Sequence, residues 1–252
     1  MNNKIIIVTH KKVDIHMSNL YHLVGVGKDN TNTDWVDSSG TNISDKNKYY
    51  CELTALYWFW KNKAMKYDVV GLCHYRRFFS RNFWSLLKNK KIENYDINCM
   101  LNEGTVILPR PFKWKNSVGE MYYKFGDGKK ADLDLMIEII KEKYPSYYES
   151  ILKILKSHSA SYCNMFIMTY TDLNNYCRWL FDILFTLEKR TDLTGYSVQE
   201  QRIYGYLSEI LLNVWVEKNE MKIKYLPMLK TEESFARKIK DEIKFILHLN
   251  NG

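Results

Sequence analysis

Short uninterrupted apolar runs mark the expected strands of this 252-residue chain. Three of them stand out, over Lys4–His10, Val69–Cys73 and Thr105–Leu108. Apolar runs of this length that do not alternate with polar residues are typical of strands buried on both faces of a parallel sheet. The pattern therefore predicts an α/β fold, with a mixed, mostly parallel sheet flanked by helices.

Apolar residues at helical spacing separate and follow these strands. Leu53, Leu56 and Trp60 fall on one face of a helix that Ser44 would cap and that would run to about Lys61. The C-terminal part is expected to be predominantly helical. Its helices are predicted over 132–144, 147–156, 173–189, 198–217 and 232–249, the last with basic residues opposite its apolar side.

Two stretches interrupt this pattern. Lys28–Ser44 is rich in Asp, Asn, Thr and Gly, and a loop of that length is unusual in a compact domain unless it binds something. Lys113–Lys130 combines four aromatic residues with three glycines and no clean period. This composition favours a substrate lid or acceptor loop, and the alternative is a surface loop folded over its own aromatic residues.

The composition indicates one globular domain with an anionic partner. Apolar residues make up 46% of the chain, and 37 Lys and Arg against 29 Asp and Glu give a net charge of +8. A positive balance favours nucleic acid, a nucleotide-linked substrate or an anionic membrane surface. The basic residues are spread along the chain and form no recognisable nucleic-acid motif, so nucleic acid is the least favoured of the three.

The five cysteines argue against a structural zinc site and a disulfide framework. They form no C-x-x-C pair and stand in apolar runs, which predicts buried free thiols in a reducing compartment. No apolar run reaches the roughly 18 residues that a membrane span needs, and Lys4–Val8 is too short for a signal-peptide core. The sequence therefore indicates a cytoplasmic protein.

The candidate chemistry begins where the run Val69–Cys73 ends. His74, Tyr75, Arg76 and Arg77 follow at once, and in an open α/β sheet ligands bind beyond the carboxyl ends of the strands. Two guanidinium groups suit a diphosphate, because each presents forked donors and stays charged near neutral pH. The alternative reading is a basic loop beside an aromatic cluster.

A second anion-binding position is predicted at the N-terminus of the 44–61 helix. Asn42, Ser44 and Asn47 cluster there, where free backbone N–H groups and the helix dipole attract anions. Plain helix capping explains the same three residues equally well.

These residues give the chain a resemblance to a bacterial family catalogued as "domain of unknown function 4422". The resemblance covers nearly the whole chain in five ordered blocks: Val8–Lys11, Asn42–Trp58, Gly71–Phe78, Tyr162–Phe166 and Arg202–Glu209. The family is associated with capsular and exopolysaccharide glycosyltransferases. The resemblance implies a GT-A-like, Rossmann-type domain over residues 1–252. Its nucleotide-sugar part would cover about 1–112 and its acceptor-side, helical part about 113–252.

The resemblance also implies a reaction. A member would move a sugar from a nucleotide-sugar donor, a UDP-hexose, to a lipid-linked or oligosaccharide acceptor during synthesis of a bacterial capsular or cell-surface polysaccharide. Some relatives are linked to UDP-galactofuranose, which makes inverting galactofuranosyl transfer the leading expectation.

The metal requirement of such an enzyme stays open here. In most GT-A enzymes the strand that corresponds to Val69–Cys73 ends in an acid pair that binds a divalent metal, whereas His74–Arg77 stands at that place in this chain. The pair Asp132 and Asp134 opens a helix and does not replace it. Fixed cations are therefore expected to neutralise the diphosphate, and dependence on Mg²⁺ or Mn²⁺ is undecided.

Individual roles follow from this reading. Thr9, His10 and the Asn42–Asn47 loop are expected to border the nucleotide, and Arg76 and Arg77 to meet the diphosphate. An inverting displacement needs a base for the acceptor hydroxyl, and the unranked candidates are Glu200, Glu209, Glu52 and His158. The residues expected to bind the acceptor or its sugar are Asn164 and Arg202.

Two other functions stay open at this point. A non-catalytic module would bind a nucleotide sugar or glycan without transferring or hydrolysing anything, and a nucleic-acid-binding protein would bind generic DNA or RNA with steep salt dependence. The amphipathic segment 232–249 permits peripheral contact with an anionic membrane, docking on the protein itself being the alternative.

Overall fold

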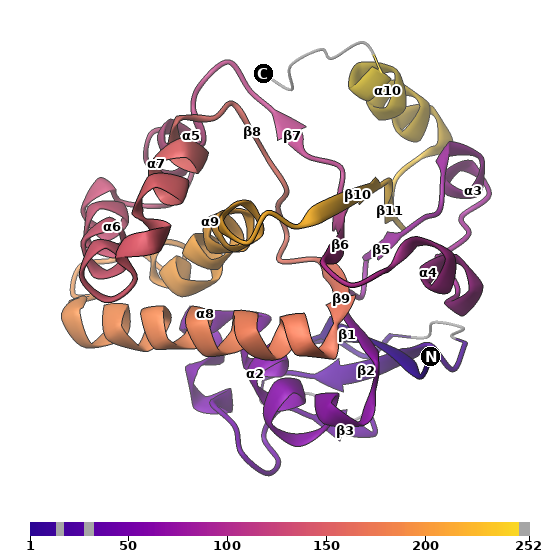
Figure 1. Ribbon diagram of the computed structural model, residues 1–252, viewed down its shortest axis with the longest axis horizontal. Coiled ribbons are helices and arrows are strands. Elements are labelled where there is room, and N and C mark those ends of the chain that lie inside the picture. Colours follow the sequence, from indigo (N-terminus) through magenta and orange to yellow (C-terminus); the bar gives the residue numbers. More distant parts are fainter. Residues whose placement is uncertain (14–17, 28–32, 247–252) are drawn as a thin grey trace.

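The computed structural model describes residues 1–13, 18–27 and 33–246 (Figure 1). Within these residues a nine-stranded sheet has the main path β10-β6-β9-β4-β1-β2-β3. The pairs β1–β2, β1–β4, β2–β3 and β6–β10 are parallel, and β9 lies antiparallel between β4 and β6. The mixed, mostly parallel sheet is confirmed. Its strands are β1 Asn3–Thr9, β2 Tyr21–Gly25, β3 Trp35–Val36, β4 Val69–His74, β6 Thr105–Pro109, β9 Phe166–Thr169 and β10 Lys222–Leu226.

Helices cover both faces of this sheet (Figure 1). Successive residues of β1 point to opposite faces, so Ile6 and Val8 join one core while Ile5 and Ile7 join the other. Both faces are buried, which explains why the strand sequences show no polar alternation. The larger core takes in α2 Leu53–Asn62, α5 Val118–Tyr123, α6 Lys130–Lys143, α7 Tyr148–Lys156, α8 Tyr170–Arg190 and α9 Ile203–Lys218, and the smaller one α3 Phe83–Leu87 and α4 Asn94–Met100.

The parallel strands bring polar residues to one edge of the sheet. Val8 at the end of β1 lies opposite His74 at the end of β4. The chain then turns, and β5 Arg77–Phe79 pairs antiparallel with β11 Met228–Lys230. The segment that follows β10 therefore reaches the same edge as the end of β4.

The helix predicted over 44–61 is interrupted in the structure. A 3-10 turn at Ser44–Lys46 leads into α1 Asn47–Tyr50, after which Cys51 takes a φ of 52° and α2 begins at Leu53. A residue with a positive φ cannot continue a right-handed α-helix, so the helix ends at Tyr50 and starts again at Leu53. The apolar period alone does not show this break, because residues on both sides keep the same buried face.

The stretch 113–130 is more regular than predicted. It begins in a small antiparallel ladder between β7 Phe112–Lys113 and β8 Ser159–Ala160, and it contains α5. Ser117 and Glu120 form a capping box at the N-terminus of α5. A helix of only six residues is too short to show a helical period in the sequence.

The two last predicted helices are shorter than expected. The 198–217 helix starts as a 3-10 turn at Glu200–Arg202 and becomes α9 only at Ile203. The final helix, α10 Phe235–Ile246, packs against α3, and residues 247–249 of the prediction lie outside the described residues. No helix within the described ranges is both long and apolar enough to cross a membrane.

Candidate functional site

A pocket of about 1040 Å³ opens beyond the carboxyl ends of β1 and β4. Its walls come from the ends of these strands, the break between α1 and α2, the loop before β9, α9 and the segment after β11. The structure brings together ten of the residues predicted for the site: Thr9, His10, Asn47, Glu52, His74, Tyr75, Arg76, Arg77, Arg202 and Glu209.

One side of the pocket is cationic. Arg76 donates to Glu232 Oε2 at 2.9 Å and lies 4.9 Å above the ring of Tyr75. Arg77 opens β5 and forms no ion pair with any of the described residues. Burial lowers the pKa of His10, and the neighbouring cations lower it further. This side therefore carries the positive potential that an anionic ligand needs.

A left-handed turn before β9 connects this side to the rest of the site. Cys163 and Asn164 have successive φ values of 75° and 50°. The Cys163 carbonyl oxygen lies 2.6 Å from His74 Nε2, and because a carbonyl only accepts, this ring nitrogen carries a proton. Non-glycine residues in this conformation cost energy and gather at functional sites. The turn thus ties the end of β4 to α9 through Cys163.

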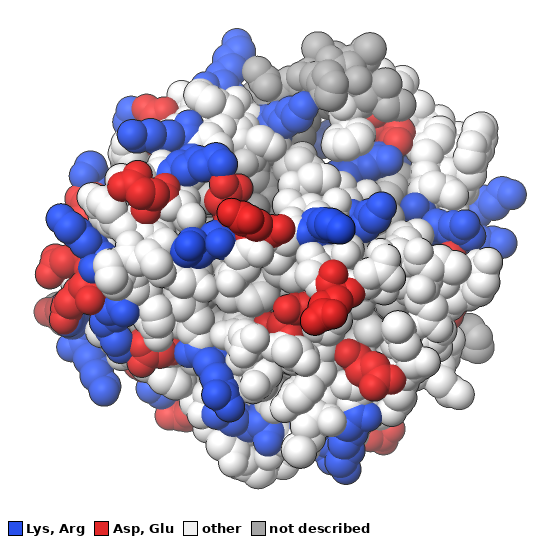
Figure 2. All heavy atoms as spheres, viewed as in Figure 1, with Lys and Arg blue, Asp and Glu red and all other residues white. Residues whose placement is uncertain are grey.

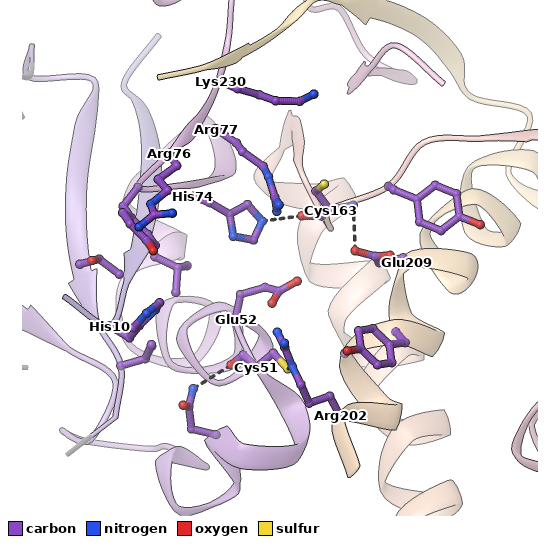
Figure 3. A pocket seen from close by; sticks show the side chains of 18 of the residues that line it. His10, Cys51, Glu52, His74, Arg76, Arg77, Cys163, Arg202, Glu209 and Lys230 are labelled. Atoms are coloured by element: carbon purple, nitrogen blue, oxygen red, sulfur yellow. Dashed lines mark hydrogen bonds between the residues drawn. The ribbon is translucent and has the colours of Figure 1, made fainter. Parts of the chain in front are cut away.

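Two carboxylates stand on the other side, Glu209 on α9 and Glu52 at the α1–α2 break. The Cys163 N–H donates to Glu209 Oε1 at 2.9 Å. Burial, followed by the charge of Glu52, raises the pKa of Glu209 to about 8, while the Cys163 N–H and the cations Arg77 and Arg202 oppose the rise. Glu209 is therefore poised to exchange a proton near neutral pH. Figure 3 shows Glu209 across the pocket from Arg76 and His10, with Glu52 between them.

Asn164, predicted to contact the acceptor, lies behind the pocket rather than in its wall. Its amide nitrogen donates to Glu52 Oε1 at 2.7 Å and lies 3.2 Å from the Gly205 carbonyl oxygen, and Ser208 Oγ lies 3.0 Å from its amide oxygen. It is 2% exposed and precedes β9 instead of entering it. Asn164 therefore positions Glu52.

Of the three residues predicted to bind an anion at the first helix, only Asn47 lies in the pocket wall. Asn47 lines the pocket, and its amide donates to the Cys51 carbonyl oxygen at 2.9 Å, which holds the break between the helices. Asn42 and Ser44 do not line the pocket, and Ser44 Oγ instead donates to Asn42 Oδ1 at 3.0 Å. Ser44 caps no helix, because it lies inside the 3-10 turn.

Two of the four candidate bases also lie outside the pocket wall. Glu200 accepts from the Ser197 N–H at 2.7 Å at the start of its 3-10 turn, and its hydrogen bonds with Ser197 lower its pKa. His158 is exposed, and its carbonyl oxygen accepts from the Trp114 N–H at 2.9 Å. Glu52 and Glu209 are the candidates that the fold places together.

The pocket includes residues that the sequence reasoning missed. All five cysteines are free, as expected, but only Cys73 and Cys177 are buried: Cys99 is exposed, and Cys51 and Cys163, at left-handed breaks in the chain, are partly buried and line the pocket. Lys230 arrives from β11, and no local signal connects that strand with the pocket. Besides Tyr75, the aromatic residues of the wall are Phe112, Trp114, Tyr162 and Tyr206, of which Trp114 belongs to the stretch predicted as a substrate lid or acceptor loop.

The end of β4 does not fit a divalent metal. The positions where an acid pair would hold a metal carry His74, Tyr75, Arg76 and Arg77, and cations repel a metal ion. In the part of the chain that the structure describes, no three His, Cys, Asp or Glu side chains are grouped for metal binding.

The sheet order, the antiparallel β9 and the charged pocket at the strand ends define a GT-A-like α/β protein of the glycosyltransferase fold class. The chain belongs to the family described as domain of unknown function DUF4422, whose model matches residues 4–220. The resemblance seen in the five sequence blocks is thereby confirmed.

A solved structure supports the fold assignment. The apo structure of the bifunctional glycosyltransferase WbbM is similar to this chain with a TM-score of 0.82 and 28% sequence identity over 92% of this chain. The chain spans 46% of the length of that structure. No curated protein matches the chain.

Proposed function

We propose that this chain is a glycosyltransferase domain that moves a sugar from a nucleotide-sugar donor to an acceptor glycan in bacterial polysaccharide synthesis. Membership of the family and the likeness to the glycosyltransferase WbbM support the class of reaction. The donor in this proposal is a UDP-hexose, UDP-galactofuranose being the first to test, and the transfer is inverting.

The observation that carries the proposal is a pair of arginines and a pair of carboxyl groups that line one pocket. Arg76 and Arg77 stand at the end of β4, and Glu209, whose pKa is raised to about 8, stands on α9 beside Glu52. Guanidinium groups suit a leaving diphosphate, and a carboxylate with a pKa near the working pH suits a general base.

The two sides divide the proposed reaction between them. Glu209 takes the proton of the acceptor hydroxyl while that oxygen bonds to C1 of the donor sugar. The bond between C1 and the diphosphate oxygen breaks, and its electron pair leaves with UDP. Arg76, Arg77 and Lys230 stabilise the charge that grows on the diphosphate. Glu52, fixed by Asn164, keeps the pKa of Glu209 high.

The place of action is also part of the proposal. We place the domain in the cytoplasm, where nucleotide sugars are made, with α10 touching the anionic inner face of the membrane. Phe235 and Ile243 of α10 are exposed beside basic residues of the same helix, which supports this contact. On the face seen in Figure 2, acidic and basic side chains are interspersed, which does not favour a nucleic-acid surface there.

Binding of UDP tests the cationic side of the proposal. We expect UDP to raise the melting temperature in the presence of EDTA, because a ligand of the native state stabilises it and the cations are built in. Arg77→Ala should weaken UDP binding about tenfold or more, since it removes a charged hydrogen-bond donor. Arg76→Ala should do the same and abolish transfer.

Arg81→Ala is the matched control, because Arg81 pairs with Asp96 at 3.1 Å outside the pocket wall. It should bind UDP like the wild type. Stabilisation by UDP that appears only with Mn²⁺ would contradict the metal-free diphosphate site. Normal UDP binding in Arg77→Ala would remove Arg77 from that site.

A further inference from the structure

We propose that Phe112, Trp114 and Tyr162 form a platform on which the terminal sugar of the acceptor stacks as a neutral pyranose ring. This inference rests on the proposed function and names its second substrate. All three side chains line the pocket and are neither fully buried nor fully exposed.

The three rings form one cluster, in which Phe112 and Trp114 stack on each other and Tyr162 stands edge-on. Phe112 and Trp114 lie nearly parallel, at an interplanar angle of 19° with centroids 6.0 Å apart. Tyr162 stands edge-on to Trp114 at 5.0 Å and 83°. A pyranose ring presents C–H bonds on its faces, and their partial positive charge matches the negative face of an aromatic ring.

Backbone contacts hold this platform in place before any ligand arrives. Phe112 pairs with Ala160 in the β7–β8 ladder, and the Trp114 N–H donates to the His158 carbonyl oxygen at 2.9 Å. The residue before Tyr162, Ser161, is fixed because its N–H donates to Asn213 Oδ1 at 3.0 Å. A preformed surface loses little entropy when a sugar binds.

The platform also offers unused hydrogen-bonding groups. Among the described residues, neither the indole N–H of Trp114 nor the hydroxyl of Tyr162 has a hydrogen-bond partner. A donor and a hydroxyl at the rim of an apolar surface suit the hydroxyl groups of a sugar. Buried aromatic side chains of a structural core would normally have these groups paired.

The position of the platform explains why the ligand is the acceptor and why it is neutral. Tyr162 immediately precedes Cys163, whose N–H holds Glu209, so the platform adjoins the proposed base. Burial and then the charge of Glu209 raise the pKa of Tyr162, which reflects the same proximity. A carboxylate at this place repels an anionic sugar, whereas the diphosphate binds on the cationic side.

The test uses saturation-transfer NMR on the whole chain with saturating UDP. The probes are methyl pyranosides of galactose, glucose, mannose and rhamnose. We expect transfer to the ring C–H protons of at least one probe in the wild type. In Trp114→Ala the signal should fall about fivefold or more, because the stacking face is lost. Trp114→Leu, which keeps apolar packing without an aromatic face, should show the same loss if the alanine variant folds poorly.

Trp84→Ala is the matched control, since Trp84 is 70% exposed on α3 and does not line the pocket. It should keep the full signal, and both Trp114 variants should keep wild-type stabilisation by UDP. A signal that survives in Trp114→Leu, or no signal in a wild type that binds UDP, would overturn the platform. Failure of the wild type to bind UDP would instead contradict the proposed function.

Discussion

Glu209 has the surroundings of a group that exchanges protons near neutral pH. It accepts one backbone hydrogen bond from Cys163, shares the pocket with Glu52, and has its pKa raised to about 8. A general base works best when its pKa lies near the operating pH. We therefore propose Glu209 as the general base of the transfer, with the charge of Glu52 keeping its pKa raised.

The pH dependence of transfer tests this assignment. We expect kcat/KM to rise with pH and to level off above about pH 8, because Glu209 must lose its proton to act. In Glu52→Gln the midpoint should move to lower pH, since the neighbouring negative charge that disfavours ionisation is gone. Initial rates measured across pH for both proteins provide the check. Glu200→Gln, outside the pocket, should leave the midpoint unchanged.

The same pKa predicts a stability effect that needs no substrate. Because the folded state holds the Glu209 proton more tightly than the unfolded state, the free energy of unfolding should fall as pH rises from 4.5 towards about 8. This decline should be weaker in Glu209→Gln. Equal pH dependence of urea unfolding in the two proteins would contradict a raised pKa.

Some of the individual site residues could be predicted from the sequence. A histidine, a tyrosine and two arginines directly after a buried strand indicated the cationic side of the pocket. The four candidate bases could be ranked only from the structure, because the local sequence around Glu209 indicates neither its burial nor its hydrogen bond from Cys163.

At the scale of elements, the break between α1 and α2 shapes the site. It gives Cys51 a φ of 52° and places Cys51 and Glu52 in the pocket wall against α9. Gly205 of α9 makes this approach feasible, because a Cβ atom there would lie 3.0 Å from Cys51 Sγ and 3.2 Å from Cys51 Cβ. Arg202, one turn earlier, donates to the same sulfur at 3.1 Å.

A pair of substitutions tests this contact. Gly205→Ala should destabilise the protein by about 1–3 kcal/mol and reduce transfer, since the added methyl group overpacks the break and shifts Glu52. Adding Cys51→Gly should recover much of both losses, because glycine removes the opposing side chain and adopts positive φ without strain. Urea unfolding and transfer rates of the single and double variants measure the coupling.

Ala55→Gly, on α2 and away from the pocket wall, is a control for ordinary helix destabilisation. It should lower stability without being rescued by Cys51→Gly. If Cys51→Gly recovered stability equally in Gly205→Ala and in Ala55→Gly, a specific contact between Gly205 and Cys51 would be contradicted.

Elements with strong periodicity were predictable, and those set by tertiary contacts were not. The strands β1, β4 and β6 and the helices α6 to α8 follow from their apolar patterns. The break at Cys51 and the left-handed turn at Cys163 and Asn164 depend on α9 and on His74, which lie far away in the sequence.

At the scale of the molecule, the pocket combines two distant parts of the chain. Arg76, Arg77 and Glu52 come from the first part of the chain, and Glu209, Lys230 and the ring of Trp114 come from residues beyond 111. The antiparallel insertion of β9 between β4 and β6, which brings the two parts together, could not be predicted from the sequence because strand pairing is non-local.

The most direct test of the proposed glycosyltransferase activity is a measurement of sugar transfer. The wild type, Glu209→Gln and Arg81→Ala would be incubated with a panel of UDP-hexoses including UDP-galactofuranose, and with the methyl pyranosides, and products would be weighed by mass spectrometry. We expect one donor to give an acceptor that is one sugar heavier, with a rate about 100-fold lower in Glu209→Gln and unchanged in Arg81→Ala. Binding of UDP-sugars by the wild type with neither transfer nor hydrolysis of any donor would contradict the claim and identify a binding module instead.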